Sequence, residues 1–233
     1  MKIICVPDVH QSNHWRKLLT IDLNIIDKIV FLGDYFDNWV NEWPDQGENF
    51  NSIIHFKKDF PDKIDILFGN HDTSYLLDER CSGYQPHKAK YIKKMIENSL
   101  EFMQIVSVYN NYIFSHAGVS YEWMKSAGIK NINEINNFFL KRPDFFRWVG
   151  PDNFGNNANE GPLWIRPESL YLTSVKGYHQ IVGHTEVGFL GYKQSPYSGM
   201  NILCIDSRTH ENIILLDTET GSFTKNALKI DPV

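Results

Sequence analysis

The chain has 233 residues, 42% of them hydrophobic, and a formal net charge of -5. This length suits one domain with a full core, and the mild negative charge argues against a broad basic surface for nucleic acid. No apolar run reaches the length of a membrane span, and Asp8 and His10 interrupt any signal-peptide pattern. The three scattered cysteines predict reduced thiols, so we expect a single cytoplasmic domain over residues 1–233.

The first part of the chain alternates strands and helices. Short apolar runs predict strands at residues 3–6, 29–32 and 64–68. Helices are expected between them, near residues 15–20 and 50–58. This rhythm implies parallel strands joined by right-handed crossovers.

The second part of the chain has a different pattern. An amphipathic helix is expected over 86–98, followed by antiparallel hairpins over 102–115 and 201–217. A parallel set followed by an antiparallel set indicates two stacked sheets with helices outside. Residues 130–161 are rich in Asn, Phe, Pro and Gly and show little periodicity. We interpret this segment as an irregular cap near a site, with a surface loop of no functional consequence as the alternative.

Five polar segments each follow a predicted strand. They are Asp8-Val9-His10, Gly33-Asp34-Tyr35-Phe36-Asp37, Gly69-Asn70-His71-Asp72, Ser115-His116-Ala117-Gly118 and Gly183-His184-Thr185. A single His or Asp at such a place is more often a helix cap or a hydrogen-bonded surface residue. Repeated delivery of polar side chains from strand ends is instead typical of the sites that α/β folds build there.

The residue types at these strand ends suit two adjacent divalent ions. Asp8 and His10 suit one ion, and Asp34 is the candidate bridge between the two. The terminal ligands of the second ion would be Asn70, His116 and His184. A mixture of imidazole, carboxylate and amide oxygen favours manganese, with iron, zinc, cobalt or nickel as alternatives, over calcium or thiolate-bound zinc.

Further residues suit proton transfer and phosphate binding. His71 should point away from its neighbour Asn70, because adjacent residues on an extended segment face opposite ways. Asp37 is placed to hold the His71 imidazole, as a general acid requires. Arg166 could bind a phosphate oxygen, or could form an ordinary surface ion pair.

These motifs resemble those of the calcineurin-like metallophosphoesterases, especially the phosphoprotein phosphatase branch with its bacterial and phage members. That branch reads Gly-Asp-x-His-Gly, Gly-Asp-x-x-Asp-Arg-Gly, Gly-Asn-His-Glu, His-Gly or His-Ala-Gly, and Gly-His-Thr. The matches span residues 8–185, and Ile205-Asp206-Ser207 extends them. The resemblance implies a four-layer α-β-β-α sandwich of two mixed sheets, a dinuclear centre with the ligands assigned above, and His71 as the proton donor steadied by Asp37. It also supports Arg166 as a phosphate clamp.

The sequence departs from the motifs of that branch at several positions. Pro7 and Gln11 replace glycines of the first motif, and Asp72 replaces a glutamate. Asn38-Trp39 stands where the branch has Arg-Gly. Asn38 can still donate hydrogen bonds to a phosphate, but it lacks the charge and the two-pronged geometry of arginine. Arg80, Arg147 or Arg208 could compensate by reaching in from elsewhere.

The predicted activity is hydrolysis of a phosphate ester by a metal-activated hydroxide, with a phosphomonoesterase as the first expectation. The alternatives are a dinucleoside polyphosphate hydrolase, a serine/threonine protein phosphatase, and a degenerate scaffold that binds a protein partner. Four aromatic residues near the second motif could stack on a base or pack in the core: Tyr35, Phe36, Trp39 and Trp43. The expected partner is a phosphorylated small molecule, nucleotide or protein, with neither a membrane nor nucleic acid involved.

Overall fold

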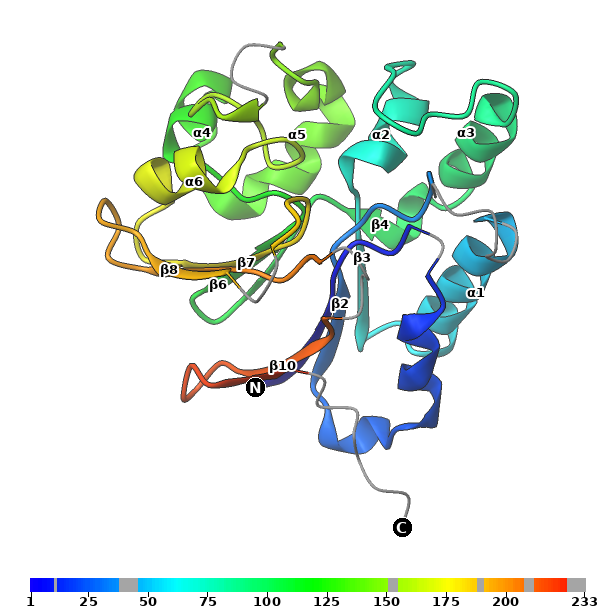
Figure 1. The fold of residues 1–233 in the computed structure, drawn as a ribbon, viewed down its shortest axis with the longest axis horizontal. Coiled ribbons are helices and arrows are strands. Elements are labelled where there is room, and N and C mark those ends of the chain that lie inside the picture. Colours follow the sequence, from blue (N-terminus) through cyan, green and yellow to red (C-terminus); the bar gives the residue numbers. More distant parts are fainter. Residues whose placement is uncertain (11, 38–45, 151–154, 188–190, 208–211, 226–233) are drawn as a thin grey trace.

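The computed structural model of the chain describes residues 1–10, 12–37, 46–150, 155–187, 191–207 and 212–225. Its strands form two sheets, each with parallel and antiparallel pairs. The two sheets face each other and helices cover their outer sides (Figure 1). The expected four-layer α-β-β-α sandwich of two mixed sheets is therefore confirmed.

The first sheet has the strand order β11-β10-β1-β2-β3-β4. Its strands are β1 (Lys2–Val6), β2 (Lys28–Phe31), β3 (Ile64–Leu67), β4 (Met103–Gln104), β10 (Ile214–Asp217) and β11 (Phe223–Lys225). The strands β1, β2 and β3 are parallel, as their alternation with helices predicts, and β10 is antiparallel to β1. Isoleucine and valine dominate the central strands, because β-branched side chains pack well on a sheet that is buried on both faces.

The second sheet has the strand order β5-β6-β7-β9-β8. Its strands are β5 (Val106–Tyr109), β6 (Tyr112–Ser115), β7 (His179–Val182), β8 (Gly191–Gln194) and β9 (Asn201–Cys204). The hairpin between β5 and β6 turns at Asn110, which has the positive φ of 53° that such a tight turn needs.

The helices lie in two groups on the outer sides of the sheets. They are α1 (Gln46–Asp59), α2 (Asn70–Leu76), α3 (Ala89–Glu97), α4 (Tyr121–Ala127), α5 (Ile135–Lys141) and α6 (Pro167–Thr173). Short 3-10 helices are η1 (His14–Thr20), η2 (Leu23–Ile25), η3 (Leu100–Phe102), η4 (Ile132–Glu134) and η5 (Pro143–Phe146). Figure 1 shows α1, α2 and α3 beside the first sheet, and α4, α5 and α6 over the second.

The core between the sheets follows the two-residue period of the strands. On β1, Ile3 and Cys5 pack into the cluster that contains Phe114 and Ile181 of the second sheet. Ile4 belongs to the cluster on the helical side instead. Alternate residues of one strand therefore fill two different layers, which fixes the register and the direction of the strand end that carries Asp8.

One pairing prediction was wrong, and a second was right only in part. The strands over 201–217 do not form a hairpin, because β9 pairs with β7 and β8 whereas β10 pairs with β1 and β11 in the other sheet. The hairpin expected over 102–115 is present as β5 and β6, but its first strand is divided, because β4 pairs with β3 instead. Apolar runs predict that a strand exists, but the choice of neighbour depends on contacts with distant segments.

The helices expected over 50–58 and 86–98 are present as α1 and α3. The segment near residues 15–20 is the 3-10 helix η1 rather than an α-helix. Within 130–161, where we expected irregular structure, the chain forms α5. Its buried residues Ile135 and Phe139 are four positions apart and so occupy one helical face toward the core.

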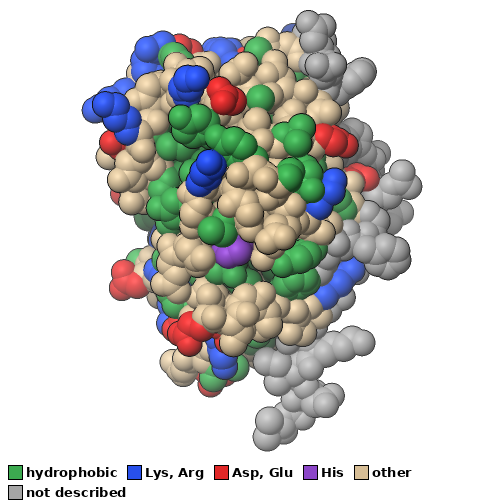
Figure 2. Space-filling model, turned by 90° about the vertical axis from the view of Figure 1, so that its left-hand side faces the viewer, with side chains coloured by type: hydrophobic (Ala, Val, Ile, Leu, Met, Phe, Trp, Pro, Cys, Tyr) green, Lys and Arg blue, Asp and Glu red, His purple; other side chains and the backbone are tan. Residues whose placement is uncertain are grey.

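The left-hand side of the molecule in Figure 1, where α4, α6 and β8 lie, is shown in space-filling form in Figure 2. On this face the lysine and arginine side chains are interspersed with acidic, hydrophobic and uncharged groups. Over the part of the chain that the structure describes, no helix has both the length and the apolar character needed to cross a membrane.

Candidate functional site

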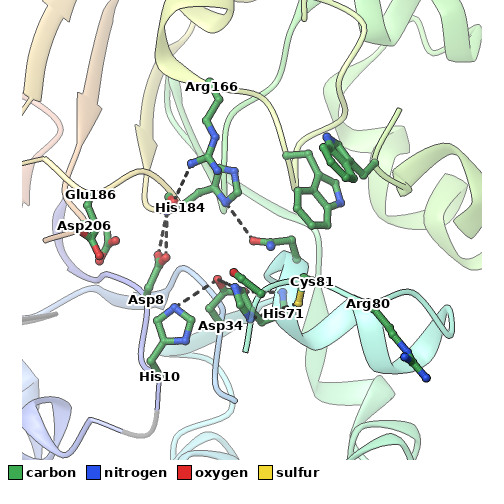
Figure 3. Close-up of a pocket in the computed structure, with 14 residues that line it drawn as sticks. Asp8, His10, Asp34, His71, Arg80, Cys81, Arg166, His184, Glu186 and Asp206 are labelled. Atoms are coloured by element: carbon green, nitrogen blue, oxygen red, sulfur yellow. Dashed lines mark hydrogen bonds and ion pairs between the residues drawn. The ribbon is translucent and has the colours of Figure 1, made fainter. Parts of the chain in front are cut away.

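The polar segments that follow the strands meet at one cavity of about 540 Å³. Asp8 follows β1, Asp34 follows β2, and Asn70 begins α2 directly after β3. His116 and His184 follow β6 and β7 of the second sheet. The cavity therefore lies where the ends of strands from both sheets come together, and Figure 3 shows Asp8, Asp34 and His184 pointing into it.

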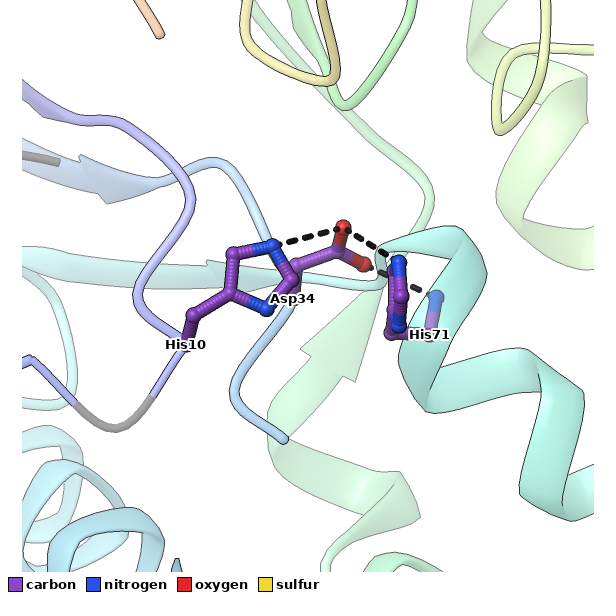
Figure 4. Close-up of side chains that lie close together, drawn as sticks. All are labelled: His10, Asp34 and His71. Atoms are coloured by element: carbon purple, nitrogen blue, oxygen red, sulfur yellow. Dashed lines mark hydrogen bonds and ion pairs between the residues drawn. The ribbon is translucent and has the colours of Figure 1, made fainter. Parts of the chain in front are cut away.

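Asp34 lies at the centre of the candidate ligands. Its Oδ2 is 3.7 Å from His10 Nε2 and 3.4 Å from His116 Nε2. Figure 4 shows the carboxylate between the rings of His10 and His71. A carboxylate with ligand atoms on two sides has the position that a bridge between two ions requires.

Asn70 connects the two histidines of the second sheet to this group. Its Oδ1 is 2.8 Å from His116 Nε2 and 3.0 Å from His184 Nδ1. The other ring nitrogen of His184, Nε2, is buried without a hydrogen-bond partner. The structure thus brings together the ligand atoms predicted for the second ion.

Backbone carbonyls orient two of the imidazoles. Nδ1 of His10 is 2.8 Å from the Phe36 oxygen, and Nδ1 of His116 is 2.8 Å from the Leu32 oxygen. A ring that donates its Nδ1 proton to a carbonyl presents the lone pair of Nε2 to the cavity. Two ligand sets, His10/Asp34/His71 and Asp8/Asp34/His116, each have their ligand atoms within 4.8 Å of one another. These donors fit divalent ions.

The backbone at the candidate site is strained. Four of the described residues with side chains have a positive φ here: His10 at 40°, Asp34 at 54°, Asp37 at 67° and His184 at 62°. Side chains rarely adopt this conformation, and a surrounding structure must hold it in place. Such strain is typical of functional sites.

Two glycines of the motifs are required by close approach to the carboxylates. A Cβ on Gly69 would lie 2.0 Å from Asp34 Oδ1, and a Cβ on Gly183 would lie 2.2 Å from Asp8 Oδ1. Any larger residue would displace these carboxylates. Steric exclusion therefore explains why glycine precedes both Asn70 and His184.

A family model described as calcineurin-like phosphoesterase matches residues 1–194. The chain belongs to this family. It is therefore a hydrolase that acts on phosphate esters, and the family implies divalent metal ions. Among curated proteins, none matches the sequence.

Solved structures of other phosphatases have the same fold as this phosphoesterase. A cold-active protein tyrosine phosphatase determined at 1.1 Å has a TM-score of 0.63 and 18% sequence identity, covering 96% of this chain and 78% of that chain. The cold-active protein-tyrosine phosphatase of a psychrophilic Shewanella species has a TM-score of 0.62 and 19% identity, covering 96% and 80%. At this level of sequence identity, the similarity shows a shared fold and nothing more.

The charges in the cavity of the phosphoesterase depend on one another. Burial would raise the pKa of Asp34, but the neighbouring His116 and His71 hold it well below its usual value. Burial, and then the negative charge of Asp206, hold the pKa of Asp8 well above its usual value. Burial and the charge of His116 lower the pKa of His184. A bound cation would favour the charged form of Asp8 and bind the neutral ring of His184.

His71 forms a dyad with Asp37 beside this ligand cluster. His71 Nδ1 is 2.9 Å from Asp37 Oδ2, and Tyr75 donates its hydroxyl proton to the other oxygen of that carboxylate. Burial opposes protonation of His71, but the negative charge of Asp34 and the bond to Asp37 raise its pKa well above the usual value. A protonated ring with its Nε2 toward the cavity can donate a proton.

The direction of His71 has a different cause from the one predicted, and that prediction was wrong. Asn70 and His71 are not on an extended segment but in the first turn of α2. Adjacent residues of a helix point about 100° apart, which sends Asn70 toward His116 and His71 toward Asp37. The two side chains diverge, but by helical rotation.

Arg166, the predicted phosphate ligand, lines the cavity. Its Nη1 donates to the carbonyl oxygen of His184 at 3.3 Å and to Thr185 Oγ1 at 3.1 Å. These contacts hold the guanidinium group against the segment that carries the candidate ligand His184 (Figure 3).

The second predicted phosphate ligand, Asn38, lies outside the described residues, as do Trp39, Trp43 and Arg208. Of the other candidate arginines, Arg80 lines the cavity. Arg147 instead binds Glu79 at 3.0 Å and the Leu77 oxygen at 2.9 Å, away from the candidate ligands.

Of the two alternatives left open for the aromatic residues near the second motif, core packing holds for Tyr35 and Phe36. Tyr35 and Phe36 are fully buried and pack against Phe50 of α1. The aromatic wall of the cavity is made instead by Trp148 and Trp164, whose rings stack 5.8 Å apart at 24°. No local motif marks Trp148, since only the path of 130–161 brings it to the cavity, whereas Trp164 belongs to the Trp-Ile-Arg-Pro segment that carries Arg166.

Acidic groups also line the cavity near Asp8. Asp206 follows β9 and is buried, and Glu186 follows His184 by two residues. Like the candidate ligands, Asp206 lies just after the end of a strand. This position is the sequence signal that could have assigned it to the site. Cys81 lines the cavity beside His71 and carries no motif in the sequence.

Proposed function

We propose that the protein is a phosphomonoesterase whose cavity holds two divalent ions, with manganese as the expected metal. The observation that carries the proposal is the convergence of imidazole, carboxylate and amide ligand atoms around Asp34. When bound, such ions lower the pKa of a water molecule and neutralise charge on the phosphoryl oxygens. Asp8 and His10 would hold one ion, and Asn70, His116 and His184 the other.

The residues around the ligands have distinct roles in this proposal. Arg166 binds a non-bridging phosphate oxygen and orients the phosphoryl group, because a guanidinium group matches the spacing of phosphate oxygens. His71 gives a proton from Nε2 to the departing alkoxide, and Asp37 keeps the ring oriented through Nδ1. Asn38 would contribute a further hydrogen bond to the phosphate. We expect no covalent phosphoenzyme in this reaction.

The aromatic wall favours substrates with a flat leaving group. Trp148 and Trp164 line the same cavity as the candidate ligands, and their exposed faces can stack on a nucleobase or a phenyl ring. This observation keeps a dinucleoside polyphosphate hydrolase as the second candidate. A phosphorylated tyrosine is another aromatic phosphate ester, and the two similar structures are those of protein tyrosine phosphatases.

We place residues 130–161 in this proposal as a cap on a single domain. Trp148 belongs to this segment and contributes to the cavity wall, whereas Phe139 and Phe146 anchor the segment in the core. A cytoplasmic location is part of the proposal too, supported by the three cysteines that are free thiols.

The test is hydrolysis by metal-stripped protein reloaded with manganese. The substrates are p-nitrophenyl phosphate, bis-p-nitrophenyl phosphate and diadenosine tetraphosphate, and the control is Asp34→Asn. Manganese-dependent activity that the control lacks would support the proposal, and the ranking of substrates separates monoesterase, diesterase and nucleotide hydrolase. Inactive protein that binds no metal would refute it. Two bound ions without activity on any of these substrates would indicate a narrow substrate whose access is gated by the cap.

A further inference from the structure

His71 has a second group of potential ligand atoms on the side of its ring that faces Asp37. Its Nε2 faces Asp34 at 4.0 Å, whereas its Nδ1 faces Asp37 and Cys81. The Sγ of Cys81 is 3.4 Å from His71 Nδ1 and 3.8 Å from Asp37 Oδ2. Figure 3 shows the sulfur of Cys81 beside the imidazole ring. One sulfur, one nitrogen and one oxygen therefore lie within 4.8 Å of one another.

The spacing of these three atoms fits a tetrahedral zinc ion. Zinc bonds of roughly 2.0–2.3 Å to nitrogen, oxygen and sulfur place tetrahedral ligand atoms about 3.4–3.6 Å apart. The separations here are 2.9 Å for Nδ1 to Oδ2, 3.4 Å for Sγ to Nδ1 and 3.8 Å for Sγ to Oδ2. Shifts of a few tenths of an ångström would make the geometry regular, and α2 and the loop after it can supply them.

The chemistry of the group differs from that of the cluster around Asp34. A thiolate sulfur selects soft or borderline ions such as zinc and cadmium, whereas carboxylate and amide oxygens also suit manganese. Cys81 lines the cavity, so an ion can enter from solvent and keep a water molecule as its fourth ligand. We propose that Asp37, His71 and Cys81 form a binding site for one thiophilic divalent cation, zinc, which inhibits the enzyme.

Zinc would inhibit because it binds the same imidazole ring, His71, that donates the proton in the proposed reaction. On binding, the Cys81 thiol and His71 Nδ1 each release a proton to solvent, and the ion takes the place of the hydrogen bond between Nδ1 and Asp37. Asp37 can then no longer stabilise the charged ring from which Nε2 gives up its proton. The inhibition rests on the proposed function of His71, whereas the binding of the ion does not.

The first experiment measures binding alone. Protein saturated with manganese is titrated with cobalt, and the sulfur-to-cobalt charge-transfer absorption is followed. We expect one equivalent of cobalt to give this band, and the variant Cys81→Ser to lack it. Cys204→Ala is the matched control that should keep the band, because Cys204 is buried in β9 and burial raises its pKa to about 12. Absence of the band in the unmodified protein, or its persistence in Cys81→Ser, would overturn the site.

The second experiment measures inhibition by zinc with p-nitrophenyl phosphate as substrate. Each variant is compared with its own rate in manganese without zinc, so any effect of the substitution on that rate cancels. We expect the half-inhibiting concentration of zinc to rise at least tenfold in Cys81→Ser and to stay unchanged in Cys204→Ala. Equal inhibition of all three proteins would show displacement of manganese instead and would overturn the inhibitory role. Inactive protein that still shows the cobalt band would refute the proposed function but not the site.

Discussion

At the scale of single residues, the candidate site depends on which atom of a side chain faces which partner. His10 and His116 both turn Nδ1 to a backbone carbonyl, at 2.8 Å in each case, and Nε2 toward Asp34. His71 differs, because its Nδ1 faces a carboxylate. A carbonyl fixes the tautomer of a neutral ligand, whereas a carboxylate stabilises a charged ring. The same residue type thus suits metal binding at two positions and proton donation at the third.

We expect His71→Ala to slow hydrolysis of an alkyl phosphate by about 100-fold or more and that of p-nitrophenyl phosphate far less. An alkoxide needs a proton as it leaves, whereas nitrophenolate is stable without one. The measurement is kcat on both substrates with manganese-loaded protein. Equal losses on the two substrates would contradict the role of His71 as proton donor.

At the scale of elements, Asp72 fastens the start of α2 to the end of β2. Its carboxylate accepts hydrogen bonds from the backbone N–H groups of Gly69 at 2.8 Å, Asp34 at 2.9 Å and Tyr35 at 2.8 Å. The sequence marked this position only as an aspartate in place of a glutamate. In the structure it holds together the two loops that carry Asp34 and Asn70.

We expect Asp72→Ala to lower the free energy of unfolding by about 3 kcal/mol, because each buried N–H left without an acceptor costs roughly 1–3 kcal/mol. The measurement is urea unfolding of metal-free protein. The matched control is Asp59→Ala at the exposed end of α1, which should change stability by less than about 0.5 kcal/mol. Equal stability of the two variants would show that the three hydrogen bonds do not stabilise this junction.

At the scale of the whole molecule, the candidate ligands connect the two sheets. Asp8 and Asp34 follow strands of the first sheet, and His116 and His184 follow strands of the second. An ion held by both groups joins the layers of the sandwich, in addition to the apolar core between them. Binding to the folded state alone also shifts the unfolding equilibrium.

We therefore expect metal removal to lower the melting temperature by roughly 5–10 °C. Manganese at about 100 times its dissociation constant adds about 2.7 kcal/mol, and each kcal/mol corresponds to roughly 2–4 °C in a domain of this size. Thermal unfolding by circular dichroism, with chelator and after readdition of manganese, measures the change. Asp34→Asn should show little difference between the two conditions. Identical melting temperatures of the unsubstituted protein with and without manganese would contradict the proposed stabilisation by bound metal.

The sequence by itself determined the family, the layered fold and the strand exits at which the candidate ligands lie. These features depend on local order, because an apolar run predicts a strand and the residue after it must emerge at the end of the sheet. Asp8, Asp34 and His184 could therefore be assigned without knowing which strands are neighbours.

Only the tertiary structure decided which distant segments meet. It separated β9 and β10 into different sheets, placed Tyr35 and Phe36 in the core, and brought Trp148 to the cavity. It also placed Cys81 beside His71, although nothing in the local pattern relates the two. Contacts of this kind depend on the packing of layers and on the paths of loops, which hydrophobic periodicity does not specify.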